Sequence, residues 1–104
     1  MLDLNELSKV ALNTATKRMN NGANINTDTG KMLKHCATEV VEAMEAYATN
    51  KYGNIGKIAF ELELADIICC VLIIAGKEQI DIEHVVLNCM EKNRKRAEGI
   101  GDKL

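Results

Sequence analysis

Along most of the chain, apolar side chains recur every three to four residues, a spacing that places them on one face of an α-helix. The first such segment carries Leu4, Leu7 and Val10. A second segment begins near Thr29, and Asp81, a residue type that caps helix N-termini, precedes the last one. Stretches rich in Asn and Gly, such as "NNGANINTDTG" and "NKYGNIG", interrupt the pattern. The sequence therefore predicts an all-α chain of four helices, over about residues 3–20, 29–49, 57–75 and 82–97.

The third segment contains "FELELADIICCVLIIA", residues 60–75, whose apolar side chains surround the helix axis instead of marking one face. A helix that is apolar all round is normally buried at the centre of a bundle or an oligomer. Gly76 follows as the expected C′ residue that ends the helix. The β-branched residues also admit a buried strand as an alternative. The uninterrupted apolar run from Ile67 to Ala75 has about half the length that a membrane-spanning helix needs, so no membrane association is expected.

Composition points to a small protein with an aliphatic core. With 104 residues, no proline and 3% aromatic residues, the chain is expected to form a single domain, residues 1–104, with a flexible tail over about 98–104. A formal net charge of −2 offers no basic excess for binding a nucleic-acid polymer. The four cysteines lie in apolar helical patterns without a C-x-x-C motif, which is typical of reduced core thiols in a cytoplasmic protein. They are Cys36, Cys69, Cys70 and Cys89.

Two pairs of acidic residues stand out on the second and third predicted helices. Glu63 and Asp66 are three residues apart, so they project from one face of a helix, and Glu39 and Glu42 have the same spacing. If the two helices pack antiparallel, the four carboxylates meet at the shared surface, where protonation or a bound cation relieves their repulsion. Oxygen ligands favour Mg²⁺ or Mn²⁺ over zinc. The alternative is that these acids are solvated surface groups, as acidic residues on helices usually are.

These motifs resemble those of the MazG-type nucleotide pyrophosphohydrolases, an all-α family related to the dimeric dUTPases. The resemblance rests on "EVVE" at Glu39–Glu42 and on "ELAD" at Glu63–Asp66, followed by the apolar run. Near the end of the chain, "KNRKR" supplies Asn93 and Arg96. The matching region covers roughly residues 30–97, most of the chain.

The resemblance implies a four-helix, bundle-like MazG fold. Because a single copy of 104 residues has a thin core around the all-apolar third helix, we expect that helix to be buried further in a homodimer or homotetramer. The resemblance also implies Mg²⁺-dependent hydrolysis of nucleoside triphosphates to monophosphates and pyrophosphate, with house-cleaning of non-canonical nucleotides as one use of the reaction. By the same resemblance, the Mg²⁺ ligands, with Mn²⁺ as a substitute ion, are Glu39, Glu42, Glu63 and Asp66. Glu39 would also accept the proton of the attacking water. The residues expected to contact the phosphates or the sugar are Lys92, Asn93 and Arg96.

The chain departs from the family pattern at two points. Many members carry a Lys four residues before the Asn, and here that position is Cys89. Some members place an aromatic residue of the first helix near the base, whereas this chain has only Tyr47, Tyr52 and Phe60, all outside that helix. The residues that recognise the base are therefore not identified by the motif. Lys17 and Arg18 could contribute from the first helix, but their spacing alone does not favour them.

Other interpretations stay open. A non-catalytic helical dimerisation or regulatory module could use the acidic cluster for solubility or ion binding. His35 lies one turn before Glu39 and could join the metal site, although an ordinary helical histidine is the alternative. Asp81 and His84 form a D-x-x-H motif that resembles part of a di-iron site, but Asp81 is better explained as a helix cap.

Overall fold

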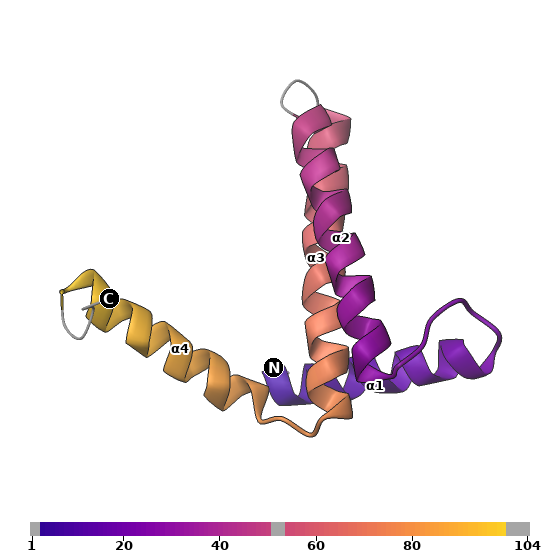
Figure 1. Cartoon of the computed structure of the whole chain (residues 1–104), viewed down its shortest axis with the longest axis horizontal. Coiled ribbons are helices and arrows are strands. Elements are labelled where there is room, and N and C mark those ends of the chain that lie inside the picture. The colour runs from indigo at the N-terminus through magenta and orange to yellow at the C-terminus, as the bar shows by residue number, and fades with distance from the viewer. Residues whose placement is uncertain (1–2, 51–53, 100–104) are drawn as a thin grey trace.

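The computed structural model describes residues 3–50 and 54–99, which form four α-helices and no strand (Figure 1). The helices are α1 (Leu4–Asn20), α2 (Thr29–Asn50), α3 (Asn54–Lys77) and α4 (Ile82–Ala97). This confirms the all-α, four-helix prediction and excludes the strand alternative for the third segment. Asp81 caps α4 as expected, because its side chain accepts a hydrogen bond from the His84 backbone N–H. Most of the predicted flexible tail, residues 100–104, lies outside the described residues.

The α2–α3 hairpin is the main packed unit. The two helices run antiparallel along each other, and α1 crosses the base of the hairpin (Figure 1). Thr29 at the start of α2 donates a hydrogen bond of 2.6 Å to Glu78, just beyond the end of α3, which closes the base. The core lies where α1, α2 and α3 meet, and its buried members are Ala15, Met32, Cys70 and Ile73.

Helix α4 points away from the hairpin and packs against the beginning of α1 (Figure 1). The Asn5 side chain connects α1 to the start of α4 through both of its polar atoms. Its amide donates to the Asp81 carboxylate at 2.9 Å, and its carbonyl oxygen accepts from the Glu83 backbone N–H at 3.2 Å. The four helices of one chain therefore do not close into a bundle by themselves.

The end of α3 differs from the sequence prediction. Helix α3 does not end before Gly76 but continues through Lys77, and the left-handed residue is Gln79 with φ 56°. Gly76 instead allows α1 to approach closely. A Cβ atom at this position would lie 3.0 Å from the Ser8 carbonyl oxygen. The Ser8 hydroxyl, which is buried, also donates a 2.6 Å hydrogen bond to the Leu72 carbonyl oxygen.

We expect Gly76→Ala to lower the free energy of unfolding by up to about 2 kcal/mol, because an overpacking cost of about 1–3 kcal/mol is only partly offset by a helix-propensity gain of about 1 kcal/mol. The matched control is Gly30→Ala in the first turn of α2, where a Cβ would meet only the end of the Asp28 side chain, at 3.3 Å. The Gly30→Ala change should leave the free energy of unfolding unchanged or raise it by about 0.5 kcal/mol. Thermal or urea unfolding measures both variants. Equal stabilisation of the two would contradict the close α1–α3 contact.

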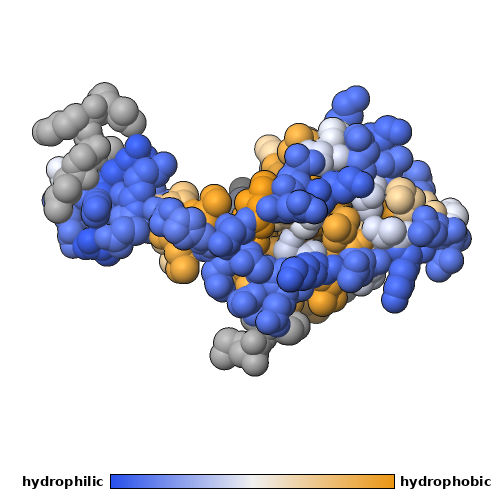
Figure 2. Space-filling view, turned by 90° about the horizontal axis from the view of Figure 1, so that it is seen from below, coloured by the Kyte–Doolittle hydropathy of each residue, from blue (hydrophilic) through white to orange (hydrophobic). Residues whose placement is uncertain are grey.

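An apolar groove runs along the outer side of the α2–α3 hairpin. We call it the outer groove, and its lining residues are Val40, Ala43, Met44, Tyr47, Phe60, Leu64 and Ile67. The rings of Tyr47 and Phe60 lie 5.6 Å apart across it. Apolar surface also gathers where the α4 arm leaves the rest of the chain (Figure 2). A single chain therefore exposes much of the apolar surface that the helical pattern predicted to be buried.

All four cysteines are free, as predicted, but they are not all core residues. Cys70 is buried, and burial raises the pKa of its thiol to about 11. Cys36 is half-buried, whereas Cys69 and Cys89 are exposed. The prediction of four core thiols is wrong for these two, because Cys69 lies on the side of α3 next to an open hollow and Cys89 lies on the projecting α4.

Candidate functional site

Three carboxylates meet at the interface of α2 and α3. Glu39 comes from α2, while Glu63 and Asp66 come from α3. One carboxylate oxygen from each residue lies within 4.8 Å of the others. The i, i+3 spacing of Glu63 and Asp66 explains how one helix presents both groups toward α2. The antiparallel pairing that the sequence argument assumed is therefore the one that assembles the cluster.

Glu39 is the most enclosed member of the cluster, with 7% of its surface exposed. One of its oxygens, Oε1, lies 3.1 Å from His35 Nε2. Its other oxygen, Oε2, is buried without a hydrogen-bond partner among the described residues, and so is Glu63 Oε2. Burial, followed by its contact with the Glu63 carboxyl and the charges of Glu42 and Asp66, raises the pKa of Glu39 to about 7.

Buried, unpartnered carboxylate oxygens are costly, because their lost hydration is not replaced. A divalent cation held by Glu39, Glu63 and Asp66 would supply a partner for carboxylate oxygens and offset the repulsion between the acids. The donor set is made of oxygen atoms only, which suits a hard cation such as Mg²⁺. The residues present therefore fit the cofactor that the motif implied.

Without a divalent cation, the stability of the protein should fall as pH rises from about 4.5 to about 7. In this range the folded state holds a proton on Glu39 that the unfolded state releases, so each rise in pH favours unfolding. The loss should be on the order of 1–3 kcal/mol. Unfolding measured in EDTA across this range tests it, and Glu39→Gln should remove most of the slope. If the stability of the unsubstituted protein does not change with pH over this range, the enclosed environment of Glu39 is contradicted.

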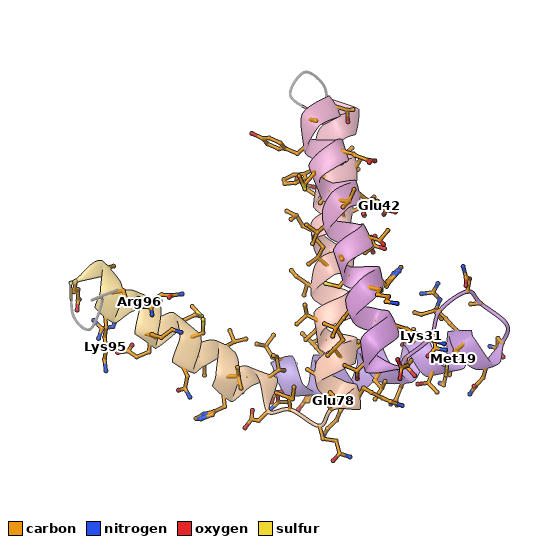
Figure 3. The ribbon with its side chains drawn as sticks, viewed as in Figure 1. Met19, Lys31, Glu42, Glu78, Lys95 and Arg96 are labelled. Carbon is orange, nitrogen blue, oxygen red and sulfur yellow. The ribbon has the colours of Figure 1, made fainter. Side chains whose placement is uncertain are left out.

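The structure does not bring all the predicted site residues together. Glu42, the fourth predicted ligand, is exposed and lies outside the three-residue cluster, although its charge acts on Glu39. The predicted phosphate contacts are on α4, and its far end, marked by Arg96, points away from the hairpin that carries Glu42 (Figure 3). Within one chain, Lys92, Asn93 and Arg96 are therefore separate from the carboxylates.

The sequence motif missed a hollow of about 280 Å³ that opens directly beside the cluster. Its walls include Glu39 and Asp66 from the cluster, Arg18 from α1 and Cys69 from α3. No motif spacing links Arg18 to the acids, because the two become neighbours only when α1 crosses the hairpin. The side chain of His35 also lines this hollow.

Asp81 does not form a metal site with His84. The Asp81 carboxylate accepts hydrogen bonds from Asn5 and from the His84 backbone N–H, both through Oδ1. The His84 ring instead lies 3.0 Å from the Asn88 amide nitrogen. Among the described residues, the acidic cluster on α2 and α3 is where three potential ligands converge. The D-x-x-H motif is thus a helix cap, as the sequence favoured.

Comparison with known proteins agrees with the geometry. A family model described as the MazG nucleotide pyrophosphohydrolase domain matches residues 27–100. A comparison with curated proteins finds no match. Over the described residues, each helix is too short or too polar to cross a membrane. The matched region contains the complete α2–α3 hairpin, its carboxylates and all of α4.

Proposed function

Since the chain belongs to the MazG nucleotide pyrophosphohydrolase domain family, we propose that it hydrolyses nucleoside triphosphates to monophosphates and pyrophosphate with the aid of Mg²⁺. One observation carries the proposal. Glu39, Glu63 and Asp66 place oxygens within 4.8 Å of one another, and two of these carboxylates keep a buried oxygen without a partner among the described residues. The proposal includes a cytoplasmic location, with which four free thiols agree.

The three clustered carboxylates would hold Mg²⁺, and the exposed Glu42 would add a ligand at the rim. When bound, Mg²⁺ supplies charge stabilisation to the phosphate oxygens. Glu39 would accept the proton of the attacking water. Its position supports this role, since it is the most buried acid of the cluster and its Oε1 is held by His35. His35 would thereby fix the orientation of the Glu39 carboxyl.

We further propose that a second copy of the chain completes the site, in a homodimer or homotetramer. The outer groove exposes apolar side chains on the hairpin, including Met44 and Leu64 at 65% and 43% exposure. Helix α4 has exposed apolar residues of its own, Val85 and Met90, and ends in a run of cations. The α4 of a partner, packed on this hairpin, would cover apolar surface and bring Lys92, Asn93 and Arg96 toward the acids.

The test is turnover of a panel of canonical and modified nucleoside triphosphates with Mg²⁺, followed by release of pyrophosphate and of the monophosphate. Pyrophosphate release that requires Mg²⁺ or Mn²⁺ is the expected result. The preference within the panel identifies the base and sugar, and a preference for modified bases would indicate house-cleaning. Release of inorganic phosphate instead would exclude the proposed bond cleavage.

A non-catalytic nucleotide-binding or dimerisation module is the competing function. The position of α4 supports this non-catalytic function, because a single chain keeps the α4 cations away from the carboxylates. Mg²⁺-dependent thermal stabilisation without turnover of any nucleotide would support this module, since a ligand that binds only the folded state raises its stability.

A further inference from the structure

We infer that Cys36 on α2 and Cys70 on α3 form a reversible disulfide across the hairpin on exposure to hydrogen peroxide, which gives the chain an oxidation-sensitive thiol pair beside its carboxylates. Formation of the bond is independent of the proposed function. Its consequence for hydrolysis rests on that function, because the bond acts on the activity through the neighbouring acidic cluster.

The pairing of α2 with α3 places three cysteines at one level of the hairpin. Glu39 on α2 meets Asp66 on α3 across the interface. Because the two helices are antiparallel, a step back along α2 matches a step forward along α3 (Figure 1). Cys36 lies three residues before Glu39, and Cys69 and Cys70 lie three and four residues after Asp66. The thiols are therefore about one helical turn nearer the base of the hairpin than the carboxylates are.

Of these three thiols, Cys36 and Cys70 belong to the packed interface. Cys70 is buried in the core cluster, and the half-buried Cys36 packs against that cluster. On α2, Cys36 shares a face with the buried Met32 and Glu39, four residues before it and three residues after it. Cys69 is exposed instead, because consecutive residues of a helix point in directions about 100° apart.

The environment of Cys70 shows how close Cys36 is and which thiol reacts first. Burial raises the pKa of the Cys70 thiol to about 11, and among nearby groups Cys36 adds the most to this rise, ahead of Cys69. The Cys70 thiol thus stays protonated at neutral pH and is a poor nucleophile toward peroxide, since the thiolate is the reactive form. Cys36, which solvent partly reaches, is the thiol that peroxide oxidises, and Cys70 then resolves the product.

The oxidation proceeds in two balanced steps. The Cys36 thiolate attacks one oxygen of hydrogen peroxide, the O–O bond breaks, and hydroxide leaves with the thiol proton as water, so that Cys36 becomes a sulfenic acid. The Cys70 sulfur then attacks the Cys36 sulfur, the S–O bond breaks, and the departing hydroxide takes the Cys70 proton. Two thiols lose two electrons and form one disulfide, while one peroxide is reduced to two waters.

The disulfide changes the spacing of the helices beside the carboxylates. Packed but unbonded atoms lie about 4 Å apart, whereas the two sulfurs of a disulfide lie about 2.05 Å apart. Closing this gap draws α2 toward α3 at the cysteine level, and Glu39 lies on the next turn of α2. Mg²⁺ demands a strict ligand geometry. We therefore expect the oxidised protein to need severalfold more Mg²⁺ for half-maximal thermal stabilisation, and its kcat/KM to fall severalfold.

Peptide mapping tests the bond without requiring turnover. The full chain is treated with hydrogen peroxide, its remaining thiols are blocked with iodoacetamide, and tryptic peptides are analysed by mass spectrometry before and after reduction with dithiothreitol. We expect a reducible link between the peptides of residues 35–51 and 58–77. Because Cys69 and Cys70 share the second peptide, the same link in a Cys69→Ser chain assigns it to Cys70. Unlinked Cys36 and Cys70 after treatment, or a link of Cys36 to Cys69 or Cys89, overturns the inference.

Cys36→Ser, compared with Cys89→Ser on the exposed surface of α4, tests the consequence for the site. Peroxide should raise the Mg²⁺ requirement and lower kcat/KM severalfold in Cys89→Ser, with recovery in dithiothreitol, and should change neither quantity in Cys36→Ser. An equal response of the two variants overturns the effect on the site, and mapping of the unsubstituted chain stays decisive for the bond if Cys36→Ser folds poorly. If the reduced protein hydrolyses no nucleotide, the proposed function fails, whereas the linked peptide and the shifted Mg²⁺ requirement still support the disulfide.

Discussion

Glu63→Gln is expected to lower kcat/KM for nucleoside triphosphates at least about a hundredfold, because a catalytic cation contributes several kcal/mol and each 1.4 kcal/mol is a factor of about ten. Glu63 is suited to this test because its Oε2 is buried without a partner among the described residues. The amide keeps the size of the side chain but replaces one ligand oxygen by a nitrogen donor, which repels a cation. Initial rates at saturating and at low Mg²⁺ separate lost metal affinity from lost turnover.

The matched control is Glu61→Gln, two residues earlier on α3, where the side chain is exposed and is not part of the cluster. It should retain nearly full activity. Glu63→Gln should also fold at least as well as the unchanged protein without Mg²⁺, because it removes one charge from a crowded acidic site. Its thermal stability should no longer rise with Mg²⁺. Equal activity of the two variants would exclude Glu63 as a ligand.

Mixing two inactive variants should restore activity if α4 acts on the hairpin of a second copy. One parent carries Glu63→Gln, and the other carries Asn93→Ala together with Arg96→Ala. After unfolding and joint refolding, mixed dimers contain one site with intact carboxylates and an intact partner α4. With random pairing, activity should return to about a quarter of that of the unchanged protein. The activity of each parent alone should be far lower.

Two controls test whether the restored activity comes from a site shared between two chains. A chain that carries all three substitutions should restore no activity when mixed with either parent, because no combination then contains a complete site. Lys95→Ala on the same helix should be active alone, since Lys95 is not among the predicted phosphate contacts. If α4 instead completes the site on the hairpin of its own chain, the mixture of the two parents will stay inactive. The light-scattering mass, at micromolar concentration, should correspond to a dimer or a tetramer.

The carboxylate cluster could be predicted from local spacing and one assumption about packing. Two i, i+3 pairs on consecutive helices converge if the helices form an antiparallel hairpin, and the short connection between them favours that arrangement. For Glu39, Glu63 and Asp66 this reasoning gave the observed neighbours. It did not place Glu42, because the rotation of α2 that buries Glu39 leaves Glu42 exposed.

Features that depend on how the helices are oriented relative to one another could not be predicted from the sequence. The course of α4 is set by Gln79 in a left-handed conformation and by the hydrogen bonds of Asn5, neither of which has a periodic signature. The prediction for Gly76 is wrong for a related reason. A glycine near the end of an apolar run normally ends a helix. Gly76 instead leaves room for α1 to pack closely against α3, and this contact has no signal in the sequence. Arg18 reaches the hollow through the same crossing of α1.

The small core of the single chain has a further consequence for how the protein responds to dilution. Few large side chains are buried within one copy, and Met32 is the largest that is fully enclosed among the described residues. If the outer groove is covered by a partner, folding and association become one linked equilibrium governed by mass action. The midpoint of heat denaturation would then rise with protein concentration, and the concentration of the chain itself would regulate how many complete sites exist.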